Sequence, residues 1–273
     1  MRIEEVLRAA RDALAASPTA RLDAELLLSR VLGRDRSYFY AWPEKPLNGD
    51  QQRLFDLLVK RRAAGEPVAH LTGEREFYGR RFVVTAATLI PRPDTETLVE
   101  AALETLPDGP ARVVDLGTGT GAVGISLALE RRDWRVTLTD ASAAALAVAR
   151  DNAEALGAAV TLVRGDWLKA LAGPFDLIVS NPPYVDPDDH HLEQGDVRFE
   201  PRSALAAHDR GLADLRVIAA QARERLTDGG WLMLEHGHDQ GGVVRRLLAE
   251  HGFQDVTTRG DLGGNDRVTL GHV

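Results

Sequence analysis

The sequence predicts an α/β protein, in which a doubly wound, mostly parallel sheet follows a small N-terminal helical domain. Two observations predict this fold class. Apolar residues recur at intervals of three and four through residues 1–65, which is the periodicity of amphipathic helices. After residue 112, short apolar runs alternate with helical patterns, as is typical of parallel strands joined by crossover helices.

The N-terminal helices are predicted from three groups of periodic apolar residues, at 6–14, 22–31 and 54–58. A break separates the second helix from the third. Pro43 and Pro46 cause it, because proline lacks an amide donor and biases the preceding residue toward extended geometry.

The pattern changes again after this bundle. Large apolar residues flank Tyr78-Gly79 and predict two short strands around a turn. These changes divide the chain into a helical bundle at 1–75, a β-hairpin connector at 76–90 and a sheet domain at 91–273.

The sheet domain is expected to open with a helix ending near Leu106. Asp94 is its expected N-cap, and Glu96 stands in its first turn, where a carboxylate interacts well with the helix dipole. Strands are then predicted at 112–116, 135–139, 160–163, 175–180 and 231–235, and helices at 122–130, 143–156, 212–226 and 243–250. Two final strands, 253–258 and 267–270, have no helix between them, so the seventh strand closes an antiparallel edge hairpin.

Composition excludes several classes of protein. The chain has 273 residues, of which 44% are hydrophobic and 27% charged, and it can bury a full core. The absence of cysteine excludes disulfides, thiolate nucleophiles and sulfur-ligated metals. A net charge of -8 argues against broad attachment to a phosphate backbone. No apolar run approaches membrane-spanning length and no secretory signal opens the chain, so we expect a cytoplasmic protein without membrane attachment.

A glycine-rich turn follows the first strand of the sheet domain. It comprises Gly117, Thr118, Gly119, Thr120 and Gly121, and it stands between a strand and a helix, the context in which such glycines approach a ligand. Asp140 ends the next strand, 23 residues after Gly117, where a carboxylate can accept both ribose hydroxyls of an adenosine. Turn and acid together predict a nucleoside-binding site.

This turn has three possible interpretations. Gly119 to Gly124 match the G-x-G-x-x-G of nicotinamide dehydrogenases, but that match alone is weak. A tight turn without a ligand is the structural alternative. In a methyltransferase the loop would pack around the methionine part of S-adenosylmethionine, with Asp115 near its ammonium group. Trp167, after the third strand, could lie against the adenine ring or belong to the core.

The sharpest motif is Asn181-Pro182-Pro183-Tyr184, at the end of a buried strand. Ligands bind at this edge of open parallel sheets. Two prolines stiffen the backbone and leave carbonyls as acceptors. If Asn181 Oδ1 and the Pro182 carbonyl each accept one N–H of a planar NH2 group, they orient its nitrogen toward a sulfonium methyl group and stabilise the developing charge. Tyr184 would stack on the flat substrate group.

These segments resemble those of the HemK/PrmC family, the release factor glutamine methyltransferases. The similarity covers essentially the whole chain, in the family's order. It is carried by residues 89–96, 115–121, 181–184, 198–201 and 234–237, and by the final 266–270.

The resemblance implies a class I S-adenosylmethionine-dependent methyltransferase fold with a mostly parallel sheet of seven strands. It implies methyl transfer to the side-chain amide of the glutamine in the Gly-Gly-Gln motif of bacterial peptide chain release factors, and an N-terminal domain that helps dock them. It implies cofactor contacts from Gly117–Gly121, Asp140, Trp167 and Asn181, and substrate contacts from Asn181, Pro182, Pro183 and Tyr184.

Other possibilities remain open from the residues. An adenine-N6 or cytosine-N4 nucleic-acid methyltransferase needs the same acceptors, but the acidic charge and the lack of a target-recognition domain disfavour it. A module that only binds the cofactor would not need the acceptor loop. His190-His191 and His236-x-His238 are expected to be structural, without a metal. Arg92 and Glu96 could border the substrate pocket or simply stabilise their loop.

Overall fold

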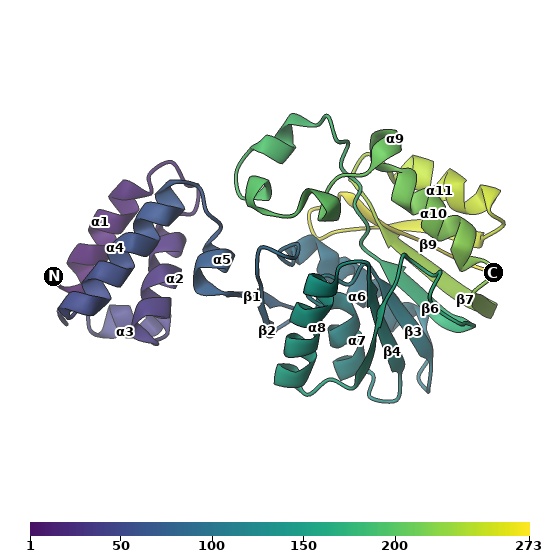
Figure 1. Cartoon of the computed structure of the whole chain (residues 1–273), viewed down its shortest axis with the longest axis horizontal. Helices are drawn as coiled ribbons and strands as arrows, with labels where there is room; N and C mark the ends of the chain where they lie inside the picture. The colour runs from purple at the N-terminus through teal and green to yellow at the C-terminus, as the bar shows by residue number, and fades with distance from the viewer. The chain divides into compact units, whose positions relative to one another are not determined.

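A computed structural model describes residues 1–273 (Figure 1). The chain forms two compact units. Unit 1 comprises Met1–Glu74 together with Gly195–Phe199, and unit 2 comprises Arg75–Gln194 and Glu200–Val273. No sequence pattern indicates that the short segment Gly195–Phe199 belongs with the N-terminal helices.

Unit 1 is helical, with α1 (Ile3–Ala13), α2 (Ala20–Leu32), α3 (Arg36–Ala41), α4 (Gly49–Ala63) and α5 (Val68–Thr72). The three predicted helices correspond to α1, α2 and α4, whereas the short α3 and α5 were not predicted. Leu27, Leu28 and Phe55 are fully buried in its core. Asn48 caps α4 by accepting from the Gln51 amide at 2.9 Å, which satisfies a donor that the first turn leaves unpaired.

An ion-pair cluster ties Gly195–Phe199 into unit 1. Arg62 of α4 donates to Asp23 and to Asp196, both at 2.7 Å. Arg198 donates to the carbonyl of Ala64 at 2.7 Å.

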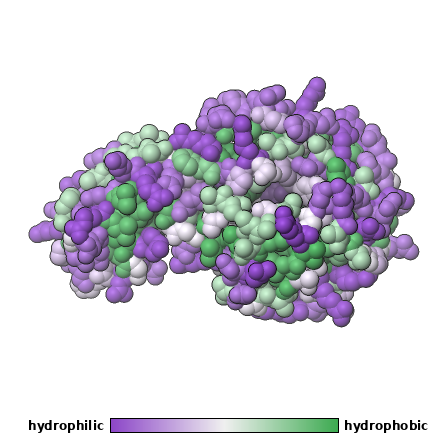
Figure 2. Space-filling model, in the orientation of Figure 1, coloured by the Kyte–Doolittle hydropathy of each residue, from purple (hydrophilic) through white to green (hydrophobic).

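Apolar side chains remain exposed on unit 1, and Figure 2 shows an apolar patch on its visible face. Leu54 and Leu57 of α4 are 46% and 52% exposed, and Tyr40 and Trp42 are 57% and 47% exposed. No helix of the structure is long and apolar enough to cross a membrane.

A hairpin of β1 (Glu74–Phe77) and β2 (Arg80–Val83) follows the helices, and all of it except Glu74 belongs to unit 2. Tyr78 and Gly79, with φ of 49° and 69°, form its turn. Glu96 accepts a hydrogen bond from the Tyr78 amide at 2.8 Å, so this carboxylate stabilises the hairpin turn.

A sheet of seven strands forms the body of unit 2, in the order β5-β4-β3-β6-β7-β9-β8. The strands are β3 (Arg112–Leu116), β4 (Arg135–Asp140), β5 (Val160–Arg164), β6 (Phe175–Ser180), β7 (Leu226–Glu235), β8 (Gln254–Gly260) and β9 (Asp266–His272). β3 to β7 pair in parallel, and β9 pairs antiparallel to both β7 and β8. The predicted doubly wound sheet with an antiparallel edge hairpin is confirmed.

Helices cover both faces of this sheet (Figure 1). α6 (Glu96–Thr105), α7 (Ala122–Glu130) and α8 (Ala143–Leu156) pack on one face, while α10 (Ala213–Ala222) and α11 (Gly241–Glu250) pack on the other. Neighbouring residues of one strand therefore enter different cores, as Val113 and Val114 do. The order in which strands are added to the sheet reverses between β3 and β6, and at such a switch point a crevice forms outside the carboxyl ends of the strands.

Two sequence expectations were wrong in detail. Asp94 does not cap α6, because Pro93–Thr95 form a 3₁₀ turn (η1) and Thr95 takes the cap position. The helix expected at 212–226 ends at Ala222, and Leu226 already belongs to β7. β7 therefore starts earlier than the predicted strand at 231–235. Its pairing with β6 is irregular around Gly229, which has a positive φ.

Between β6 and β7 lies an irregular segment that the sequence did not resolve into elements. It contains η2 (His190–Glu193), η3 (Val197–Phe199), η4 (Arg202–Ala204) and the single turn α9 (His208–Gly211).

Candidate active site

The glycine turn links β3 to α7. Gly117, Gly119 and Gly121 have φ of 66°, 56° and 83°, a region that other residues rarely adopt. The Gly119 amide donates to Asp140 Oδ2 at 3.0 Å, and the Ser142 amide donates to Oδ1 at 2.8 Å. Asp140 is thereby fixed beside the turn, and its remaining lone pairs can accept hydroxyl groups of a ligand.

A cavity of about 520 Å³ lies at this edge of the sheet, entirely within unit 2. Most of the predicted cofactor residues line it, namely Gly117, Thr118, Gly119, Thr120, Asp140, Trp167 and Asn181. Gly121 is not in its wall but supports the turn, where an added Cβ would meet Ile125 and Ala149. The volume is in the range of small-molecule sites.

Asp115 is an acid in the wall of this cavity and is only 2% exposed. It accepts from Thr118 Oγ1 at 2.5 Å and from the Gly124 amide at 3.0 Å. Burial nevertheless raises its pKa to about 7, because desolvation outweighs both hydrogen bonds. A cationic group in the cavity would relieve this penalty, so Asp115 fits the ammonium group of a methionine moiety.

Trp167 lies against the glycine turn. A Cβ at Gly117 would stand 3.2 Å from the indole ring, so a larger residue there would press on the ring in addition to straining the backbone at a φ of 66°. Trp167 has a φ of 49°. Its side chain also hydrogen-bonds Asp214. Burial raises the pKa of the Asp214 carboxyl, and this hydrogen bond only partly offsets the increase. The indole lines the cavity and also packs against the core that contains α10 and α11, so the structure is consistent with both positions expected from the sequence.

Asn181 follows β6 directly and lines the cavity with Pro183. Its Nδ2 donates to Thr95 Oγ1 at 3.2 Å. No donor of the chain bonds its Oδ1 or the carbonyl of Pro182, so both acceptors have spare capacity. Pro182 itself is buried and does not line the cavity.

Tyr184 also lies outside the cavity wall. Its hydroxyl donates to Glu235 Oε1 at 3.3 Å, and its ring packs against the core that contains α10 and α11. Its carbonyl accepts from Gln240 Nε2 at 3.1 Å. Stacking of Tyr184 on a substrate therefore stays a prediction.

Glu235, at the end of β7, is a buried acid to which the sequence analysis gave no role. It is 1% exposed, its Oε2 has no hydrogen-bond partner, and burial raises its pKa to about 7. The available signal was an acid ending an apolar strand at the ligand-binding edge.

The sequence left the roles of Arg92 and Glu96 open, and the two residues have different surroundings in the structure. Arg92 lines the cavity and forms an ion pair with the buried Glu200, which also accepts from the Ile90 amide at 2.8 Å. Glu96 does not line the cavity and bonds the hairpin turn instead.

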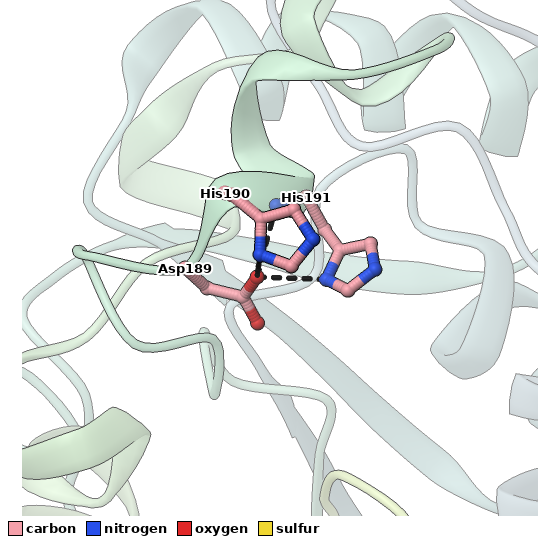
Figure 3. Close-up of side chains that lie close together, drawn as sticks. All are labelled: Asp189, His190 and His191. Carbon is pink, nitrogen blue, oxygen red and sulfur yellow. Dashed lines mark hydrogen bonds and ion pairs between the residues drawn. The ribbon is translucent and has the colours of Figure 1, made fainter.

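Asp189, His190 and His191 form a small cluster on η2 (Figure 3). Asp189 caps this turn by accepting from the His191 amide at 2.9 Å and contacts His191 Nδ1 at 2.8 Å. Both rings are exposed, so a 3₁₀ cap accounts for the cluster. His236 is buried between Thr269 and the Gly237 carbonyl, whereas His238 is exposed.

Solved structures of methyltransferases share this fold. A methyltransferase from Pyrococcus furiosus matches with a TM-score of 0.56 at 20% identity, covering 78% of this chain and 96% of that one. A T. thermophilus 16S rRNA N2 G1207 methyltransferase, solved with AdoMet and guanosine, matches with a TM-score of 0.51 at 23% identity, covering 73% and 49%. The fold is that of the class I S-adenosylmethionine-dependent methyltransferases, as predicted.

Sequence comparison identifies the family. Residues 5–73 match the PrmC N-terminal domain, and residues 94–197 match the methyltransferase small domain. The release factor glutamine methyltransferase of Escherichia coli K12 is 50% identical over 99% of both chains, and that of Pseudomonas aeruginosa is 51% identical over 93% of both. The chain belongs to the family of release factor glutamine methyltransferases.

Proposed function

We propose that this protein transfers the methyl group of S-adenosylmethionine to the side-chain amide nitrogen of the glutamine in the Gly-Gly-Gln motif of bacterial peptide chain release factors. The observation that carries the proposal is the position of Asn181 beside the glycine turn, in the wall of one cavity. Relatives with this substrate in their names align over nearly the whole chain.

The cofactor is proposed to lie between Asp140, Trp167 and Asp115. Asp140 would accept the ribose hydroxyls, Trp167 would face the adenine ring, and Asp115 would pair with the ammonium group. When bound, S-adenosylmethionine supplies a methyl group on a positively charged sulfur.

The substrate amide is proposed to be held by acceptors of the tetrapeptide. Asn181 Oδ1 and the Pro182 carbonyl would each accept one N–H, which turns the nitrogen lone pair toward the cavity. As the nitrogen becomes positive, both acceptor bonds strengthen and stabilise the transition state. The alkylated nitrogen is acidic and can release its proton afterward, so a strong base is not required.

We further propose that unit 1 docks the release factor. Its exposed apolar side chains, Leu54, Leu57, Tyr40 and Trp42, are of the kind that form interface cores. With a release factor as substrate, the site of action is the cytoplasm, and no direct contact with DNA is expected.

The test is a methyl-transfer assay with radiolabelled cofactor. The acceptors are a release factor and its copy with the Gly-Gly-Gln glutamine changed to alanine. We expect label only on the unaltered factor. Equal labelling of both factors would reject the proposed acceptor, and labelling of DNA instead would favour a nucleic-acid methyltransferase.

A further inference from the structure

The acceptors proposed to hold the substrate amide lie on a loop, so their positions depend on what fixes that loop. At its start, Asn181 follows β6 directly. At its end, the carbonyl of Tyr184 accepts a hydrogen bond from Gln240 Nε2 at 3.1 Å. Gln240 does not line the cavity, so it can act on a ligand there only through other residues.

Both ends of the Gln240 carboxamide are hydrogen-bonded to the backbone. Its Oε1 accepts from the Gly237 amide at 2.8 Å, and its Nε2 donates to the carbonyls of Tyr184 at 3.1 Å and Arg210 at 3.2 Å. With the carboxamide turned over, its NH2 group would face an N–H and its oxygen would face two carbonyls. The partners therefore fix one orientation of the side chain, which joins three separate backbone segments.

The backbone of Gln240 is itself held in place. Its amide donates to the Gly237 carbonyl at 2.9 Å, and its own carbonyl accepts from the first turn of α11, from the amides of Val243 and Val244. Because β6 and β7 are neighbouring parallel strands, the loops that follow them leave the same edge of the sheet. Gln240 therefore braces the loop after β6 against a hydrogen-bonded turn after β7.

The turn α9 contacts the same carbonyl from another direction. A Cβ on Gly211 would stand 2.0 Å from the Tyr184 oxygen and 2.9 Å from Gln240 Nε2. Asp209 and Arg210 have φ of 56° and 55°, a left-handed conformation that is unfavourable for residues with a Cβ. Strained backbone of this kind persists where neighbouring groups hold it, and the hydrogen bond from Gln240 to the Arg210 carbonyl is one such contact.

We propose that Gln240 is a positioning residue, which holds the Tyr184 carbonyl between the turn after β7 and α9. The two prolines between Asn181 and Tyr184 have a restricted φ, so a shift of the Tyr184 carbonyl moves the rest of the loop with it. Fixing this end therefore sets the positions of the two acceptors, Asn181 Oδ1 and the Pro182 carbonyl. The inference rests on the proposed function, because these positions matter to the rate only if the acceptors hold an NH2 group.

Gln240→Leu removes the three hydrogen bonds with little change of volume. We expect it to lower kcat roughly 10- to 100-fold, because a misplacement of about 1 Å at a reacting group can have that effect. The Kd for S-adenosylmethionine should change by less than about twofold, since Gln240 does not line the cavity. The matched control is Arg223→Met, because Arg223 donates to the Gly252 carbonyl at 2.9 Å and joins two other segments of unit 2. The control should keep kcat within about twofold of the wild type, even where urea unfolding shows an equal loss of stability.

Gly211→Ala tests the same carbonyl without changing Gln240. Its Cβ would displace the Tyr184 oxygen, so kcat should fall by a similar factor. Gly157→Ala is the control, because Gly157 also has a left-handed φ, of 67° against 79° for Gly211, but its Cβ would meet nothing within 4 Å. When Gln240→Leu and Gly211→Ala are combined, the loss should be smaller than the product of the two single losses, because both act through one carbonyl.

Three results would overturn the inference. They are a Gln240→Leu enzyme within about twofold of the wild type, a loss of kcat no larger than that of an equally destabilised Arg223→Met, and losses that multiply in the double variant. If the wild type methylates the Gly-Gly-Gln glutamine while any of these occurs, the proposed function stands and only the inference fails. If the wild type does not methylate that glutamine, the proposed function has failed.

Discussion

The backbone amide of Gly119 donates a hydrogen bond to Oδ2 of Asp140 at 3.0 Å. This bond joins the turn after β3 to the end of β4, so two separate sequence motifs form one part of the cavity wall. Asp140 both holds the turn and has free lone pairs facing the cavity.

Asp140→Ala is expected to weaken S-adenosylmethionine binding roughly 10- to 100-fold, since charge-assisted hydrogen bonds contribute about 1.5–3 kcal/mol each. Isothermal titration calorimetry measures this. Asp133→Ala is the matched control, because Asp133 is an exposed acid just before the same strand. An unchanged Kd in Asp140→Ala would contradict the proposed ribose contact.

Asn181→Ala should lower kcat roughly 100- to 1,000-fold, the usual effect of removing one group that stabilises transition-state charge. Binding of cofactor should persist, because Asp140, Asp115 and Trp167 are unchanged. Single-turnover assays beside calorimetry separate the two effects. A variant that turns over normally would exclude Asn181 from holding the amide.

Asp115 should make the stability of the cofactor-free protein depend on pH. Burial raises its pKa from an ordinary 3.8 to about 7, so between these values the folded chain binds more protons than the unfolded chain. This acid therefore lowers the free energy of unfolding as pH rises from about 4 to about 7, with no further change above. Asp115→Asn should remove that component.

Thermal unfolding at pH 5, 6 and 8 measures the difference between the wild type and Asp115→Asn. The variant should gain in relative stability as pH rises, and Asp133→Asn should not. Parallel curves for the wild type and Asp115→Asn would show that Asp115 is not the titrating group.

Gly124 and Gly242 are two helical glycines in different surroundings. A Cβ at Gly124 would stand 2.2 Å from Leu138 Cδ2 and 3.0 Å from the Asp115 Cβ, whereas a Cβ at Gly242 would meet only Arg245 Nη2, at 3.9 Å. Gly124→Ala should therefore cost about 1–3 kcal/mol by overpacking and weaken cofactor binding through Asp115. Gly242→Ala should gain up to about 1 kcal/mol from helix propensity. Urea unfolding of both variants checks the contrast, which equal effects would refute.

Arg62→Met should destabilise unit 1 by about 3 kcal/mol, because it leaves the buried Asp23 without its ion-pair partner. Arg53→Met, on the same helix, breaks an exposed ion pair with Asp50 and should cost less than about 1 kcal/mol. Chemical denaturation of the two variants compares these losses. An equal, small loss would mean that the Asp23 pair contributes little.

Much of the fold could be predicted from sequence because periodicity reports which face of an element is buried. The order of strands and helices after residue 112 follows from it, as do α1, α2 and α4. Element ends were less predictable. Asp94 has the chemistry of an N-cap, but the 3₁₀ turn of Pro93–Thr95 moves the helix start beyond it.

The sequence by itself determined which residues gather at one edge of the sheet, because Gly117–Gly121 and Asn181 each follow a strand that ends there and Asp140 is the last residue of another. Only the tertiary structure decided what supports them. Tyr184, Arg210 and Gln240 lie far apart in the chain, and the fold brings the first two carbonyls to the amide of Gln240. No local pattern encodes which way an amide points, because its direction depends on partners that only the folded sheet brings into contact.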